Sequence, residues 1–158
     1  MLGKLVKELR MLGYDTIYHR GEIVYHLIEQ ARQEGRVILT RDTKLFPRKP
    51  EDRIFRVMED DPILQLRELV QKGYISLDEE ALFSRCLLCN GLLDEISRED
   101  AEGDVPDFIS HQQKTFFRCP QCRRIYWAGS HQENMQRRVE KLRFQIAEYG
   151  SKNLKSKI

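Results

Sequence analysis

The opening segment of the chain alternates apolar and polar residues with the period of a helix. Its apolar side chains recur every three or four positions, at Leu2, Leu5, Val6, Leu9 and Leu12. Charged residues stand between them, so this segment is expected to form an amphipathic helix. Gly13 follows the last apolar position and suits the left-handed conformation that ends many helices. The residues YDTIYH that come next are typical of a short strand.

Helix and strand patterns continue to alternate along the first half of the chain. The apolar positions of the second helical pattern are Ile23, Val24, Leu27, Ile28 and Ala31. This pattern ends at Gly35, and the apolar run 37–39 predicts a strand buried on both faces. After a polar connection with two prolines, IFRVM predicts another strand and the segment from Pro62 a third helix. This order of elements predicts an α/β fold with a mostly parallel sheet and flanking helices.

The character of the sequence changes near residue 83. Two cysteine-containing segments, FSRCLLCNGLL and TFFRCPQCRRIYW, flank a stretch rich in Asp and Glu that we expect to be a loop. Further on, apolar residues return at helical spacing, at Met135, Val139, Leu142, Ile146 and Tyr149. We therefore expect an α/β domain over residues 1–82, a small module over 83–132, and an amphipathic helix with a basic tail over 133–158.

Composition is that of a globular protein. Of the 158 residues, 41% are hydrophobic and 33% charged, and no low-complexity run occurs. Apolar runs are broken within a few positions, whereas a membrane span needs roughly 20 apolar residues in a row. The N-terminal segment lacks the charged head, apolar block and cleavage site of a secretion signal. These features predict a cytoplasmic protein that does not span or bind a membrane.

Charge is distributed unevenly along the chain. Residues 1–83 hold 14 Lys and Arg against 15 Asp and Glu, and residues 84–110 hold 2 against 7. Residues 111–158 hold 11 basic against 3 acidic residues, so the last third carries a net charge of +8. Such a segment attracts polyanions, which makes nucleic acid the first partner to consider. The alternative is that the basic tail only keeps the protein soluble.

Four cysteines, Cys86, Cys89, Cys119 and Cys122, form two C-x-x-C pairs. Two such turns supply the four tetrahedral ligands of a closed zinc site, which predicts a zinc ribbon whose metal is structural. Iron-sulfur or redox chemistry is the alternative, and disulfides are disfavoured in a cytoplasmic chain. The 29 residues between the pairs exceed the usual roughly 15 to 20, and the acidic loop accounts for the excess. With the sulfur shell complete, His111 and His131 are not expected to be ligands.

Aromatic and basic residues alternate around the second cysteine pair. Such a surface can stack bases and neutralise phosphates. The residues that we expect to contact RNA are Lys114, Arg118, Arg123, Arg124, Arg137 and Arg138. The alternative is that the aromatic residues Phe117, Tyr126 and Trp127 only form the core of the small module.

Acidic residues stand at several expected ends of strands and starts of helices. Asp42 directly follows the buried strand, Glu22 opens the second helix, and Asp60 and Asp61 precede Pro62. Ligands of open α/β sheets gather at the carboxyl ends of strands, where carboxylates can hold a metal. Each of these residues taken singly is also explained as a helix cap or a partner of the helix dipole.

Taken together, several segments resemble a known family. MLGKLVKELRMLGYDT, EGRVILTRD, LQLREL, SRCLLCNGLL and FFRCPQCRRIYWAGSH resemble the Mut-seven C-terminal ribonuclease domain family over residues 1–135. The resemblance implies a PIN-like nuclease fold with an appended zinc ribbon. It also implies metal-dependent hydrolysis of RNA, with carboxylates holding Mg²⁺ or Mn²⁺. Asp42 matches the family's aspartate after the buried strand, Glu22 falls near an acidic position, and Asp60 and Asp61 match a further one less well.

One departure from the family leads to a second hypothesis. Chains of this family usually open with a strand whose aspartate lies just before the segment equivalent to MLGKL, and this sequence begins at Met1 without it. The first hypothesis is an endoribonuclease that uses Asp42 and Glu22 with Asp60 or Asp61. The alternative is a catalytically impaired protein that binds RNA or a ribonucleoprotein. A third is a protein-interaction role for the apolar face of the C-terminal helix.

Overall fold

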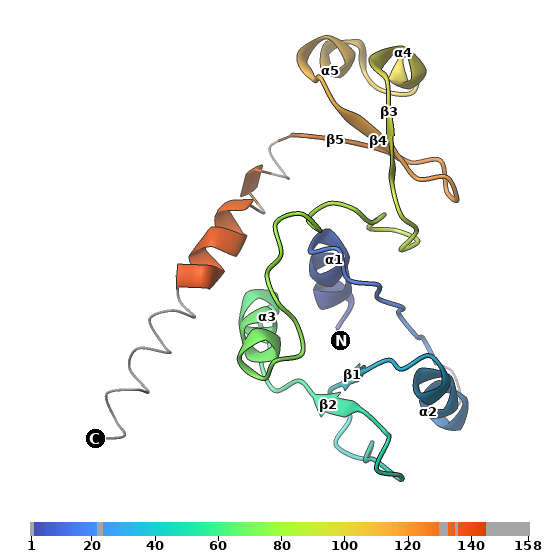
Figure 1. Cartoon of the computed structure of the whole chain (residues 1–158), viewed down its shortest axis with the longest axis vertical. Coiled ribbons are helices and arrows are strands. Elements are labelled where there is room, and N and C mark those ends of the chain that lie inside the picture. The colour runs from blue at the N-terminus through green and yellow to red at the C-terminus, as the bar shows by residue number, and fades with distance from the viewer. Residues whose placement is uncertain (1, 22–23, 130–132, 135, 145–158) are drawn as a thin grey trace.

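The first half of the chain is a small α/β unit. The computed structural model describes residues 2–21, 24–129, 133–134 and 136–144. Its first five elements are α1 (Gly3–Met11), α2 (Val24–Gln33), β1 (Ile38–Thr40), β2 (Ile54–Arg56) and α3 (Pro62–Gln71). The two strands pair in parallel, with Ile38 opposite Ile54 (Figure 1). The predicted helices and both strands near residues 38 and 54 are therefore confirmed.

Local sequence signals explain where these helices begin and end. Asp61 caps α3, because its carboxylate accepts hydrogen bonds from the backbone N–H groups of Ile63 and Leu64. Proline stands in the first turn of α3, where no N–H donor is needed. Gly13 follows α1 with φ of 88°, and a Cβ atom there would lie 2.3 Å from the carbonyl oxygen of Ala81. Only glycine fits this position.

The main hydrophobic core lies between α1, α3 and the C-terminal segment. Leu5 and Leu9 of α1 pack with Leu66 and Leu69 of α3 and with Val139 and Leu142. The last two belong to a helical stretch over residues 136–144, which confirms that part of the predicted C-terminal helix. Its apolar positions in the described stretch therefore pack within the chain, and those at Met135, Ile146 and Tyr149 lie outside the described residues. No helix in the described part of the chain is long and apolar enough to cross a membrane.

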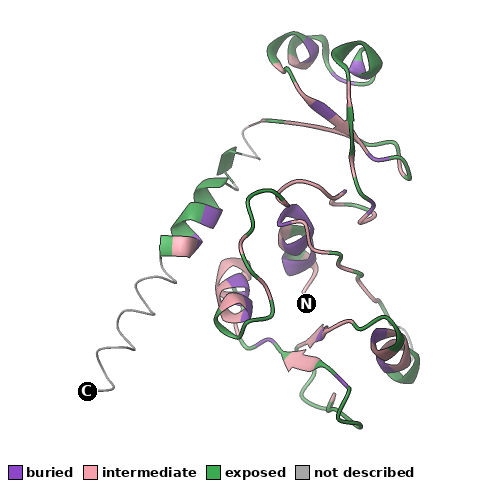
Figure 2. Cartoon of the chain, in the orientation of Figure 1, coloured by how far each residue is buried: buried purple, intermediate pink, exposed green. Residues whose placement is uncertain are grey.

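The second half contains a separate antiparallel sheet. Its elements are β3 (Asp94–Ile96), α4 (Arg98–Ala101), α5 (Asp107–Gln112), β4 (Phe116–Arg118) and β5 (Ile125–Trp127). The strand order is β3-β4-β5. Phe116 is completely buried and packs with Ala101 and Val105 in a small core. Buried positions of this module are purple at the top of Figure 2. The small module therefore has a core that is distinct from that of the α/β unit.

The strand predicted at YDTIYH is wrong, because residues 14–20 form no strand. Side chains bind this segment instead. The Arg10 guanidinium donates to the Thr16 carbonyl oxygen at 2.8 and 3.0 Å, and the Thr16 N–H donates to the Asn90 side chain at 3.0 Å. Arg36 donates to the Asp15 carbonyl oxygen. Backbone groups of Asp15 and Thr16 are thus satisfied without a strand partner.

The acidic stretch between the cysteine pairs is also more ordered than predicted. It forms β3, α4 and α5 rather than a loop. The Ser97 hydroxyl caps α4 by accepting from the Asp100 N–H, and Ala101 at the end of α4 is buried against Phe116. These helices have four and six residues, so they are too short to show a helical period in the sequence.

Candidate functional site

The four cysteine sulfurs form one compact group. The Sγ atoms of Cys86 and Cys122 lie 3.5 Å apart and those of Cys89 and Cys119 3.4 Å apart, and all four lie within 4.8 Å of one another. All four cysteines are free thiols, so no disulfide joins them. Zn–S bonds of about 2.3 Å in a tetrahedron place sulfurs roughly 3.8 Å apart. The residues therefore fit a four-cysteine zinc site, as the spacing predicts.

The two cysteine turns are built in the same way. In the first, the Asn90 N–H donates to the Cys86 carbonyl and the Cys86 N–H donates to the Gly91 carbonyl. In the second, the Arg123 N–H donates to the Cys119 carbonyl and the Cys119 N–H donates to the Arg124 carbonyl, which is the same pattern. Asn90 and Arg123 both adopt positive φ, 73° and 63°. Each turn thus aims two sulfurs at one point through its own backbone bonds.

Hydrogen bonds around Cys86 favour its thiolate form. Burial alone raises the pKa of this thiol, but hydrogen bonds from the Cys89 and Leu88 N–H groups, the Tyr126 hydroxyl and the Cys122 thiol together outweigh it and lower the pKa to about 6. The Tyr126 oxygen lies 3.1 Å from Sγ. A thiolate is the form that binds zinc, so Tyr126 supports the ligand from outside the ligand shell.

The first cysteine turn is joined to the α/β unit through a buried arginine. Arg10 of α1 is only 8% exposed, and it donates to the carbonyl oxygens of Leu87 at 3.0 Å and Leu88 at 2.7 Å. The same guanidinium holds the Thr16 carbonyl, as described above. Asn90 adds a second link, because its side chain donates to the Asp15 carboxylate at 2.6 Å. The first cysteine turn and segment 14–16 therefore share one hydrogen-bond network.

The basic residues predicted to contact RNA differ in how free they are. Lys114, Arg123 and Arg124 are exposed. Arg118 is instead held by the Asp104 carboxylate at 2.8 Å and by the Asp100 carbonyl at 2.7 Å. Farther along, Arg137 donates to the Asn134 side chain at 2.8 Å, and Arg138 pairs with Glu8 of α1 at 3.0 Å. Lys114 and the two arginines at the tip of the second cysteine turn, Arg123 and Arg124, are thus the most available of the predicted set.

The aromatic residues of the module are partly buried. Trp127 packs against the small core around Phe116, and Phe117 and Tyr126 are half-buried. The alternative that these rings serve as core therefore holds for Trp127. His111 is exposed, and its Nδ1 atom lies 2.6 Å from the Asp107 carbonyl oxygen. His131 lies outside the described residues.

Three of the four predicted acidic residues lie at the carboxyl ends of the parallel strands. Asp42 follows β1 and accepts a hydrogen bond from the Lys44 N–H at 2.8 Å. Asp60 follows β2 and pairs with Arg41, the neighbour of Asp42, at 2.5 Å. Asp61 caps α3. The fourth, Glu22, lies outside the described residues.

These carboxylates do not converge to a ready-made ligand set. Among the residues that the structure describes, the four cysteines are the only group of three or more His, Cys, Asp or Glu side chains close enough to share a metal ion. Carboxylate oxygens are of the type that Mg²⁺ and Mn²⁺ prefer. The three described carboxylates, Asp42, Asp60 and Asp61, are thus of a type that binds these metals and lie at the same edge of the sheet. Their oxygen atoms are too far apart to share one metal ion as they stand.

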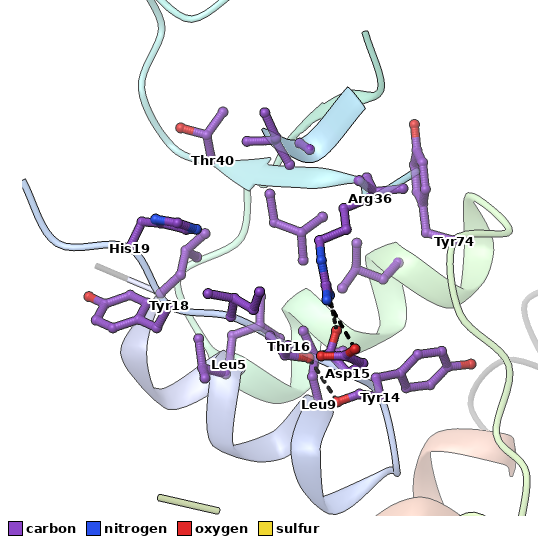
Figure 3. A pocket seen from close by; sticks show the side chains of 18 of the residues that line it. Leu5, Leu9, Tyr14, Asp15, Thr16, Tyr18, His19, Arg36, Thr40 and Tyr74 are labelled. Carbon is purple, nitrogen blue, oxygen red and sulfur yellow. Dashed lines mark hydrogen bonds and ion pairs between the residues drawn. The ribbon is translucent and has the colours of Figure 1, made fainter. Parts of the chain in front are cut away.

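A pocket of about 470 Å³ lies between α1, β1 and residues 14–19. Arg36 points into it and pairs with Asp15 at 3.0 Å (Figure 3). This arginine holds the pKa of the Asp15 carboxyl below its usual range. Neither residue stands out in the sequence, because an Asp after a helix and an Arg before a strand carry no pattern of their own. Of the predicted acidic residues that the structure describes, Asp42, Asp60 and Asp61, none lines this pocket.

Comparison with known proteins gives one match. The family model described as the Mut7-C RNAse domain matches residues 1–139, which include both the α/β unit and the four cysteines. No match emerged among curated proteins or among solved structures. The resemblance found in the sequence motifs is therefore confirmed.

Proposed function

The chain belongs to the Mut7-C RNAse domain family, and we propose on that premise that it is a metal-dependent endoribonuclease. In such a reaction water attacks the phosphorus of an RNA phosphodiester and one P–O ester bond breaks. Glu22, Asp42, Asp60 and Asp61 would hold Mg²⁺ or Mn²⁺ at the carboxyl ends of β1 and β2. A divalent metal held there lowers the pKa of bound water and offsets the negative charge on the phosphate.

The observation that carries this proposal is the ion pair between Arg41 and Asp60. It joins the residue next to Asp42 to the segment after β2, although these segments are separated along the chain. Parallel pairing of β1 and β2 directs both segments to one edge of the sheet, where open α/β sheets bind their ligands. A cation that binds there competes with Arg41 for Asp60, so metal binding requires this pair to open.

RNA cleavage in the presence of Mn²⁺ tests the proposed site. We expect Asp42→Asn to lower the cleavage rate at least about 100-fold, because a ligand and its charge are lost. Asp78→Asn is the matched control, since Asp78 is also exposed and also accepts from the N–H two residues ahead. It should cleave like the parent. Equal cleavage by the parent and Asp42→Asn at equal thermal stability contradicts the assignment.

The second candidate function is RNA binding without cleavage. It is favoured by the separation of the acidic residues in the described part of the chain. Arg123 and Arg124, exposed at the second cysteine turn, would then neutralise phosphates. Their replacement by Gln should reduce the slope of log affinity against log salt by about 1.4, given about 0.7 per phosphate contact on a single strand. A parent that binds RNA but leaves it intact with Mn²⁺ and Mg²⁺ supports this function over the first.

A further inference from the structure

The connection between β1 and β2 carries a second basic surface with an exposed aromatic ring. We call residues 43–50 the β1–β2 loop. Phe46 in the middle of this loop is 66% exposed, and Lys44, Arg48 and Lys49 around it are exposed too. The loop projects at the bottom of Figure 1 and is mostly exposed in Figure 2. An exposed aromatic ring within a run of cations is the combination that proteins use to bind single-stranded nucleic acid.

The β1–β2 loop is anchored at both ends, so this exposure is built into the fold. Leu45 packs inward against the small cluster of Ile28, Ala31 and Ile38, which turns its neighbours outward. Behind the loop, the buried Asp52 carboxylate accepts from the backbone N–H groups of Arg48 at 2.8 Å and Lys49 at 3.0 Å.

A further contact holds Asp52 itself. Arg32 of α2 pairs with its carboxylate at 2.8 Å. The backbone at residues 48–52 is therefore fixed to α2, with the Arg48 and Lys49 side chains left exposed to solvent.

The cations of this loop are not used within the described structure. Arg41 before the loop pairs with Asp60, and Arg53 after it donates to the Gly35 carbonyl. In contrast, the Lys44, Arg48 and Lys49 side chains make no hydrogen bond or ion pair with a described residue. Three positive charges that have no partner among the described residues lie beside the exposed Phe46 ring. Together they attract an anion that also has flat apolar faces.

We propose that the β1–β2 loop binds single-stranded RNA, with one base stacked on Phe46 and phosphates held by Lys44, Arg48 and Lys49. Every base offers a face for stacking, and a basic groove beside it follows the phosphate backbone. The inference rests on the proposed function, since it takes RNA to be the substrate. The loop begins directly after Asp42. Because β1 and β2 are parallel, the loop leads from the carboxyl end of β1 back to the amino end of β2. RNA bound at the Lys44 end of the loop therefore lies beside Asp42.

Charge replacement tests the phosphate contacts. Binding of a fluorescent single-stranded oligoribonucleotide to the full chain is followed by anisotropy over a salt series. The triple variant Lys44→Gln, Arg48→Gln, Lys49→Gln should reduce the salt slope by about 2, because about 0.7 is lost per phosphate contact. The control variant Lys4→Gln, Lys7→Gln, Lys72→Gln removes the same charge from exposed lysines elsewhere and should leave the slope nearly unchanged.

Replacement of the ring tests stacking separately. Phe46→Ala should weaken binding about tenfold, whereas Phe46→Tyr keeps an aromatic face and should bind like the parent. A fully paired duplex should show no difference between the parent and Phe46→Ala, since its bases are not free to stack on the ring.

The outcomes separate the two proposals. If the parent binds RNA, and Arg123→Gln with Arg124→Gln weakens it, but the loop variants bind like the parent, the loop inference is wrong and the proposed function stands. Equal loss from Phe46→Ala and Phe46→Tyr also overturns the stacking. A parent that binds no RNA overturns the loop inference and the proposed function together. If Asp42→Asn loses cleavage but still binds RNA through the β1–β2 loop, both proposals are supported.

Discussion

The two candidate metal sites of this chain are organised in opposite ways. The cysteine turns of the small module form their geometry through their own backbone hydrogen bonds, and their four sulfurs already lie within 4.8 Å. The acidic residues of the α/β unit are each held by a local contact: Asp42 by the Lys44 N–H, Asp60 by Arg41 and Asp61 by the start of α3. The four cysteines are already positioned by the backbone of their own turns, which suits a structural metal. The acidic residues are held apart by local contacts, so a bound cation would have to draw them together.

The two regions are nevertheless not independent. Arg10 of α1 binds both segment 14–16 and the first cysteine turn. Arg85 adds a link in the reverse direction, donating to the carbonyls of Gly13 at 3.1 Å and Asn90 at 2.9 Å. These bonds fix the small module to residues 14–16, which form one wall of the pocket in the α/β unit.

Loss of zinc should have the largest effect and should show how far this order extends. Structural zinc contributes about 10 to 16 kcal/mol to small zinc domains, so Cys119→Ser should unfold β3, β4 and β5. Helices α1 and α3 have a core of their own and should remain, while amide signals of residues 14–16 shift. Zinc content and two-dimensional NMR measure both results.

The parent treated with a chelator provides the matching control. It should give the same spectrum as Cys119→Ser and recover on addition of Zn²⁺, which the variant cannot do. Unchanged signals at residues 14–16 in both samples would show that the module and the pocket wall are uncoupled.

The second prediction concerns the link itself. Arg10→Met keeps the volume of the side chain but leaves the carbonyls of Thr16, Leu87 and Leu88 without their donor. We expect the free energy of unfolding to fall by about 2 to 4 kcal/mol, because hydrogen bonds to a charged donor are lost in a partly buried place. Urea unfolding of the zinc-loaded protein measures this change. Arg10→Lys should recover little, since one ammonium does not span the planar fork of a guanidinium.

Lys7→Met is the control for the second prediction. Lys7 stands on the same helix and is exposed, so its replacement should change stability by less than about 0.5 kcal/mol. Similar losses in both variants would mean that Arg10 stabilises the protein only through helix composition.

Arg10 also shows where sequence analysis stops. Helix periodicity placed it among the polar residues of α1, and the cysteine spacing alone predicted that the four cysteines come together in one group that could hold a metal ion. Both of these signals are local. The burial of Arg10 and its contacts with Leu87 and Leu88 depend on residues far away in the chain, which no single-sequence pattern records.

The same reason explains the wrong strand at residues 14–19 and the position of the acidic residues. A strand needs a partner strand, whereas here side chains of Arg10, Arg36 and Asn90 bind the backbone of Asp15 and Thr16. The alternation of strands and helices predicts that Asp42 and Asp60 lie at one edge of the sheet. The ion pair between Asp60 and Arg41 could not be predicted from it.

The third prediction, with the smallest effect, concerns pH and the α/β unit. Arg32 beside Asp52 holds the pKa of that carboxyl below the ordinary value of 3.8. A lowered pKa in the folded state stabilises the protein above pH 3.8, and this stabilisation is lost as the pH falls below that value. Asp52→Asn should therefore lower the melting temperature by a few degrees at pH 7, and the gap to the parent should narrow toward pH 3.

The gap between parent and variant is the useful quantity, because zinc is also lost in acid as its thiolates are protonated. That loss affects both proteins equally and cancels in the difference. Asp78→Asn serves as the control, since Asp78 is exposed and caps only a local turn, and it should show no gap at any pH. A gap for Asp52→Asn that stays constant from pH 7 to 3 would mean that the ionised carboxylate does not hold the β1–β2 loop. The order of that loop would then depend on Leu45 alone, and the contrast between a preformed cysteine site and a loosely held acidic edge would become sharper.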